Sequence, residues 1–155
     1  MLLAGARVRG WLRGHQFNRL SDLLQNLHEQ YVTLYDASAR PLQPTGREWQ
    51  ATELQVARNE ILLVVPTDSG GISDPSETIP KVQIAVELMV GPWQVAGNIH
   101  TLDRVHPLDF LLAAHGRFFP ITEAEIRAAD GSARRAPLVL PNGERIFAFS
   151  QRATG

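Results

Sequence analysis

The chain has no cysteine, which excludes disulfide bonds, zinc sites built from thiolates and thiol nucleophiles. It also has no excess of one charge. Its 15 basic and 16 acidic residues leave a net charge of −1, so no overall field draws it toward nucleic acid or an anionic membrane. No apolar stretch reaches the roughly eighteen residues of a membrane span, and the apolar start at residues 1–6 is too short for a signal peptide. We therefore expect a cytoplasmic protein without membrane association.

The sequence does contain an internal repeat. When it is shifted by 87 positions, residues 1–38 lie on residues 88–125 without a gap. Many aligned pairs are apolar on apolar, such as Leu12 with Ile99, so the shift preserves which side chains face a core. Six pairs are identical: Val8/Val95, Gly10/Gly97, Asp22/Asp109, Leu24/Leu111, His28/His115 and Ala37/Ala124.

The match resumes with a small displacement near the end of each half, where residues 54–65 parallel residues 138–149. Between the halves, residues 67–80 contain three acids together with several Gly, Pro and Ser residues, a composition typical of a linker. We predict three parts: a first β-rich repeat at 1–66, an acidic linker at 67–80 and a second β-rich repeat at 81–155.

Each copy is predicted to form a small curled sheet or open barrel of four or five strands with one short amphipathic helix, so the fold class is mainly β. The helix of the first copy has an apolar stripe at helical spacing, made of Leu20, Leu23, Leu24 and Leu27. The predicted strands are 6–14, 30–37, 49–56 and 61–65 in the first copy, and 82–90, 93–101, 117–124, 136–140 and 146–149 in the second.

Turn and cap residues support these elements in the second copy. Pro107 in the first turn and Gly116 just past the end delimit a helix. Asp109 lies in the first turn, where the helix dipole favours a carboxylate. Asn142 and Gly143 lie between two apolar runs, which is typical of a hairpin turn. We therefore expect the last two strands of each copy to pair as a hairpin.

The first copy begins at Met1, which aligns with Leu88, so it lacks most of the strand predicted at residues 82–90. Open strand edges invite pairing. We therefore expect a self-associating or partner-binding protein in which the second copy or a second chain fills this edge.

Arg7, Arg9 and Arg13 recur at a period of two, with Trp11 and His15 in the same phase, so these side chains face one side of the first strand. The pattern is typical of a strand that follows a phosphate backbone and stacks a base on an aromatic ring. It is also typical of a solvated face whose arginines guard an exposed edge. The second copy does not repeat it.

Residues 7–18, RVRGWLRGHQFN, resemble the first signature of Sm-like RNA-binding barrels, a strand with spaced glycines that leads to an aromatic residue and an asparagine. Residues 56–61, VARNEI, are similar to the second signature, although the glycine after Arg58 is absent. This resemblance implies that Phe17, Asn18 and Arg58 lie in loops that hold nucleotides. The tandem layout also resembles bacterial small-barrel domains of unknown function, which implies no activity.

Other residues could carry chemistry. Residues 68–71, DSGG, are similar to the nucleophile stretch of trypsin-like serine proteases, but too little chain precedes them for that scaffold, so we interpret them as linker. His28 and His115 are interpreted as helix-terminal histidines that complement the dipole; the alternative is a pair of ligands or general bases. His100 and His106 flank Asp103, which is compatible with a metal site.

Three functional hypotheses follow. The first is a non-enzymatic interaction or scaffold module, without cofactor, metal or catalytic residues, that binds a protein partner or a second copy of itself. The second is single-stranded RNA binding, which the near-neutral charge does not favour. The third is a metal protein or enzyme that uses histidines with Asp103 or Asp109. The face that would bind nucleic acid or another anionic partner comprises Arg7, Arg9, Trp11, Arg13, His15, Phe17, Asn18 and Arg58.

Overall fold

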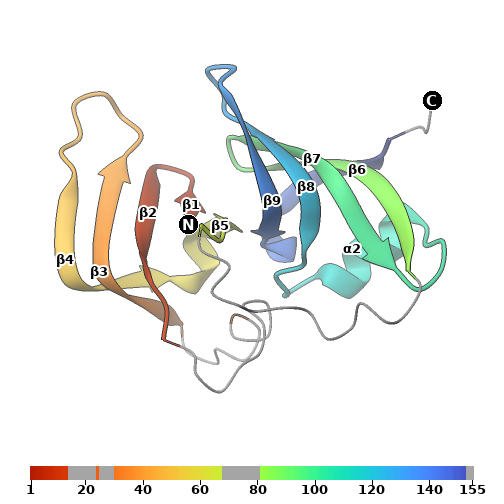
Figure 1. The fold of residues 1–155 in the computed structure, drawn as a ribbon, viewed down its shortest axis with the longest axis horizontal. Coiled ribbons are helices and arrows are strands. Elements are labelled where there is room, and N and C mark those ends of the chain that lie inside the picture. Colours follow the sequence, from red (N-terminus) through yellow and green to blue (C-terminus); the bar gives the residue numbers. More distant parts are fainter. Residues whose placement is uncertain (14–23, 25–29, 68–80, 153–155) are drawn as a thin grey trace.

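The computed structural model describes residues 1–13, 24, 30–67 and 81–152. Ten antiparallel strands form one open sheet in the order β10-β6-β7-β8-β9-β5-β1-β2-β3-β4 (Figure 1). The mainly β fold class predicted from the sequence is confirmed. The strands are β1 (Leu2–Leu3), β2 (Ala6–Trp11), β3 (Tyr31–Pro41), β4 (Trp49–Ala57), β5 (Ile61–Val64), β6 (Val82–Val90), β7 (Trp93–Thr101), β8 (Ile121–Arg127), β9 (Ala133–Pro141) and β10 (Ile146–Gln151).

Alternation of apolar and polar residues explains the central strands. In β7 the side chains of Trp93, Val95 and Ile99 are buried, and the polar residues between them lie on the opposite face, as the period of two in a strand requires. Strands β6 and β7 have the predicted bounds, and the turn between them places Gly91 at a φ of 55°, a conformation that favours glycine.

The helix of the second half, α2 (Pro107–Ala114), forms for the predicted reasons. Proline opens it, Asp109 lies in its first turn, and Gly116 beyond its end has a φ of 76°. The ring of His106 caps it, because Nδ1 accepts a hydrogen bond of 3.3 Å from the backbone N–H of Leu108. His115 is the residue that follows the last turn.

In the first half, the predicted helical residues Leu20, Leu23 and Leu27 lie outside the described residues, as do His28 and the whole linker from residue 68 to 80. Leu24, which is described, is helical and fully buried. The predicted division at 1–66, 67–80 and 81–155 stays a prediction.

The predicted terminal hairpins are wrong. Among the described strands, β10 pairs with β6 and not with β9, and β5 lies between β1 and β9 instead of beside β4. Short 3₁₀ helices, η1 (Arg58–Glu60) and η3 (Gly143–Arg145), redirect the chain between the last two strands of each half. Asn142 caps η3, with its side-chain oxygen 3.1 Å from the backbone nitrogen of Glu144, so it does not form a two-residue hairpin turn.

Strand β5 belongs to two hydrophobic cores at once. Ile61 and Val64 pack into the core of the first half, whereas Leu62 and Leu63 pack into the core of the second half. Phe118 of the second half is buried in the first core in return. The two halves therefore cover each other's apolar side chains through this strand.

The shortened first strand of the first half is β1, which has only two residues. Its two residues pair with β2 on one side and with β5 on the other. Beyond Val8, no described strand pairs with β2 on the side that faces β1. The second half joins the first half at β5, the strand next to β1. There Leu63 and Val64 of β5 pair with Pro141 and Leu140 of β9.

Candidate anion-binding surface

Strand β2 presents the basic residues that the sequence singled out. Arg7, Arg9 and Trp11 are exposed, and Val8 between the arginines is buried. In the pairing with β3, Arg7 lies directly opposite Arg40. Like charges in such a cross-strand pair destabilise a sheet by about 0.2–1 kcal/mol, a cost that a bound anion would remove.

A further arginine reaches this place from the second half. Arg134 is the second residue of β9. Partial burial, followed by the charges of Arg7 and Arg9, lowers its pKa from the ordinary arginine value. The amino group of Met1 lies under the influence of the same arginines and is mostly neutral at pH 7. Burial, then Arg134 and Arg9, lower the pKa of its ammonium group to about 6. We name Arg7, Arg9, Arg40 and Arg134 the arginine surface.

A small cavity lies within this surface, between the two halves. It has a volume of about 230 Å³ and is lined by Leu2, Arg7, Trp93 and Arg134, together with residues of the β8–β9 hairpin. The guanidinium of Arg7 lies 5.4 Å from the centroid of the Trp93 ring, a cation–π contact that fixes its position. The cavity lining therefore combines apolar side chains with the side chains of two arginines.

No carboxylate neutralises the arginine surface in the part of the chain that the structure describes. The described ion pairs join Glu125 to Arg127 and Arg135, and none involves a member of the surface. Asp130 is a described carboxylate that the charge of Arg7 influences. Hydrogen bonds from the side chain and backbone of Ser132 lower the pKa of Asp130 first, and the charge of Arg7 contributes less. Among the described residues, the surface thus has more positive charge than nearby carboxylates balance.

The remaining described residues of the predicted site, Arg13 and Arg58, have other neighbours than the arginine surface. The guanidinium of Arg13 lies 3.8 Å from the centroid of the Tyr35 ring, and Tyr35 is the cross-strand partner of Trp11. Arg58 is half-buried on η1, where it lies 5.8 Å from the ring centroid of Phe118. Its Nε atom is buried without a hydrogen-bond partner among the described residues. His15, Phe17 and Asn18 lie outside the described residues.

Sequence reasoning missed two members of the surface. Arg40 lies on β3 and Arg134 on β9, 33 and 127 positions after Arg7. Their only signal was the presence of an arginine within three residues of a predicted strand. The pairing of β2 with β3, and the approach of β9 through β5, bring them to Arg7.

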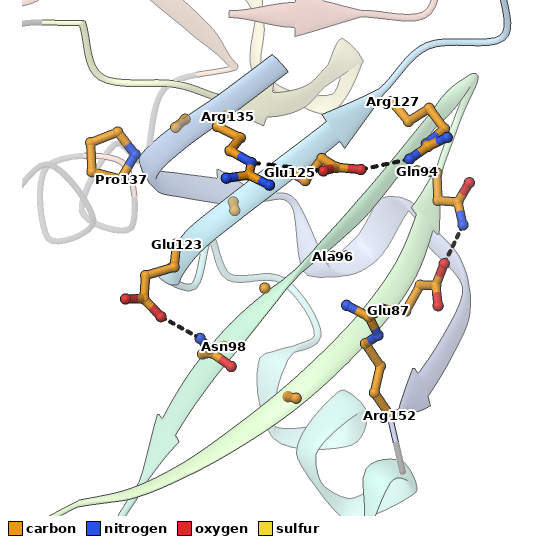
Figure 2. Close-up of a pocket in the computed structure, with 14 residues that line it drawn as sticks. Glu87, Gln94, Ala96, Asn98, Glu123, Glu125, Arg127, Arg135, Pro137 and Arg152 are labelled. Carbon is orange, nitrogen blue, oxygen red and sulfur yellow. Dashed lines mark hydrogen bonds and ion pairs between the residues drawn. The ribbon is translucent and has the colours of Figure 1, made fainter. Parts of the chain in front are cut away.

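A larger pocket of about 930 Å³ lies on the polar face of β6, β7, β8 and β9 (Figure 2). Each of its three carboxylates accepts a hydrogen bond from a lining side chain, and three lining arginines balance their charge. Arg127 donates to a Glu125 oxygen at 2.6 Å, which lowers the pKa of that carboxyl, and Asn98 donates to Glu123 at 2.8 Å. Gln94 donates to Glu87 in the same way. These paired groups leave less unbalanced charge for a ligand than the arginine surface does.

The histidines predicted for a metal site have other partners. His100 hydrogen bonds through Nε2 to the hydroxyl of Thr122 at 2.7 Å, and His106 caps α2. The described residues contain no group of three His, Asp or Glu side chains that could hold a metal ion.

Among the described residues, no helix is long and apolar enough to cross a membrane. No protein-family model, curated protein or solved structure matches the chain.

Proposed function

We propose that the chain is a tandem duplication of one five-stranded unit and works as a non-enzymatic interaction module whose arginine surface binds an anionic partner. The crowding of Arg7, Arg9 and Arg134 without a described ion pair carries the functional part of this proposal. The duplication explains how the scaffold for that surface arose.

Backbone irregularities at the same spacing support the duplication. Asp36 and Glu123 are the two described non-glycine residues with positive φ, at 47° and 51°, and they are 87 positions apart. Each marks a register shift opposite a glycine, Gly10 in β2 and Gly97 in β7. Two β-bulges of this kind at the predicted spacing are difficult to reconcile with chance, because the irregularity is a specific conformation and not a composition.

Strand order supports it as well. The first half runs β5-β1-β2-β3-β4 and the second half runs β10-β6-β7-β8-β9, which is the same order of equivalent strands. Near the end of each unit the equivalent residues are 85 apart. Leu54 pairs with Leu34 as Val139 pairs with Ile121. Each unit would then be an open, curled sheet.

The arginine surface gives the module its ligand class. Guanidinium groups bind carboxylate and phosphate oxygens through paired hydrogen bonds, and three or more of them without ion-pair partners favour a polyanion. Because the arginines of β2 have no equivalents in β7, the surface exists once in the molecule and lies where the two units meet. We therefore expect an anionic segment of a protein partner to bind across the junction.

One observation favours single-stranded RNA as the anionic partner. Trp11 is 62% exposed on the strand that carries Arg7 and Arg9, so an unstacked base could lie on its ring while the arginines hold phosphates. This second candidate agrees with the resemblance of residues 7–18 to Sm-like barrels. The two partners differ in their dependence on Trp11.

The test measures binding of a fluorescent polyglutamate peptide and a fluorescent oligouridine strand by anisotropy at several salt concentrations. We expect salt-sensitive binding, weakened about tenfold, or about 1.4 kcal/mol, in the double variant R9A/R134A. Arg104→Ala, which removes an exposed arginine elsewhere, is the matched control.

Trp11→Ala separates the partners, because loss of base stacking costs about 1–3 kcal/mol in RNA binding and should leave the peptide unaffected. Absence of binding to both probes, or equal binding by wild type and R9A/R134A, would overturn the proposed function.

A further inference from the structure

The ten-stranded sheet ends in two free edges. Among the described strands, β10 pairs only with β6, and β4 pairs only with β3. Inside the molecule the two halves meet through antiparallel pairing of β5 with β9. Under the proposed duplication, β10 is the equivalent of β5 and β4 is the equivalent of β9. The two free edges are therefore the same pair of strands that already join within the chain.

The side chains at these edges show the same relation. Leu62 of β5 and Phe118, which forms an isolated bridge to Asn142 at the end of β9, are each 1% exposed at the internal junction. Their equivalents are Phe147 on β10 and Tyr31 at the start of β3, which are 65% and 53% exposed. Two large aromatic side chains thus lie in solvent at the positions where the junction buries its anchors.

The rest of β10 follows the same pattern. Ile146 and Phe149 pack against the core of their own half, as Ile61 and Val64 do in β5. Ala148, like Phe147, is exposed, whereas Leu62 and Leu63 at the equivalent positions enter the core of the neighbouring half. Strand β10 therefore has one side that packs internally and one that lacks the neighbour that β5 has.

We propose that β10 of one molecule pairs with β4 of a second copy in the geometry of the internal β5–β9 junction, so that the protein associates head to tail. This inference rests on the proposed duplication and does not depend on the arginine surface. In this register Ala148 lies opposite Val56 and Phe149 lies opposite Gln55. Because the two contacting edges differ, the assembly has a free edge at each end until it closes as a ring, and otherwise it grows as a filament.

The contact between molecules is weaker than the junction within the chain. Gln55 replaces the buried Leu140, so one apolar side chain is missing from the contact. Ala57 replaces Asn142, whose side-chain amide donates a 3.0 Å hydrogen bond to the carbonyl of Ile61. Association is therefore reversible and depends on protein concentration.

Light scattering of the full chain at increasing concentrations tests the proposal. The wild-type mass should rise above that of a monomer. F147E places a charge at the β10 edge and Y31E places one at the β4 edge, so each variant should remain a monomer. Leu112→Glu, at an equally exposed leucine on α2, is the control and should associate as the wild type does. Circular dichroism shows that each variant is folded.

Mixing the variants is decisive because the contact is heterologous. F147E keeps an intact β4 edge and Y31E keeps an intact β10 edge, so each alone is a monomer and an equal mixture should form dimers and nothing larger. A monomeric wild type at all concentrations, or association that F147E and Y31E leave unchanged, overturns head-to-tail pairing. Anisotropy with the polyglutamate peptide on F147E separates the two proposals, because the arginine surface is intact in that variant.

Discussion

Gly10 and Gly97 mark places where two backbones approach too closely for a side chain. A Cβ atom on Gly97 would lie 2.5 Å from Cγ2 of Ile121 and 2.8 Å from the carbonyl oxygen of Thr122. A Cβ atom on Gly10 would lie 2.9 Å from the Cβ of Leu34. Both glycines lie opposite a bulge, so the bulged strand bends over the glycine and fills the space that a Cβ would need.

We expect Gly10→Ala and Gly97→Ala each to lower the free energy of unfolding by about 1–3 kcal/mol, because the added methyl overpacks a close contact. Gly5→Ala, where a Cβ would meet nothing within 4 Å, should change it by less than about 0.5 kcal/mol. Urea unfolding followed by circular dichroism gives the three values. Unequal effects at Gly10 and Gly97, with one of them neutral, would contradict their equivalence.

At the scale of elements, β5 and β10 have the same place in the strand order of their halves and different surroundings. All four residues of β5 are buried because it lies between β1 and β9, whereas β10 pairs with only one of the described strands, β6. The sequence predicted both strands from their apolar runs. It could not show their different burial, since that depends on which strand lies alongside.

Leu62→Ala and Phe147→Ala test this difference directly. Leu62→Ala should lower the free energy of unfolding by about 2–5 kcal/mol, because it leaves a cavity in the core of the second half. Phe147→Ala removes a larger side chain that is exposed in the monomer, so we expect a change within about 0.5 kcal/mol in dilute solution. A loss of stability for Phe147→Ala comparable to that of Leu62→Ala would show that β10 is covered.

For the whole molecule, exchange of side chains across the junction makes the halves dependent on each other. Phe118 and Leu140 complete the first core, and Leu62 and Leu63 complete the second. Removing either half would expose buried apolar side chains of the other. The molecule should therefore unfold as one cooperative unit although it has two cores.

Tryptophan fluorescence can report this coupling, because Trp93 is 3% exposed in the second half while Trp11 and Trp49 in the first half are exposed and sense little change on unfolding. We expect Leu34→Ala, a core change in the first half, to lower the free energy of unfolding read from Trp93 by about 2–5 kcal/mol. A Trp93 transition that Leu34→Ala does not move would mean that the halves unfold independently.

The sequence by itself determined the mainly β class, the bounds of β6 and β7, the proline and glycine that delimit α2 and the exposure of Arg7 and Arg9. These features depend on patterns among residues that are close in sequence. The patterns are the period of two in a strand and the positions of proline and glycine at the ends of a helix.

Only the tertiary structure decided which strands became neighbours. It placed β5 beside β9, made β4 and β10 the edges among the described strands, and brought Arg40 and Arg134 to Arg7. The hairpin expected at Asn142 was wrong for the same reason, because its side chain bonds to Ile61 far along the chain. Contacts between distant segments depend on how the faces and edges of the sheet pack against one another. A short stretch of sequence does not show which face or edge it will contact.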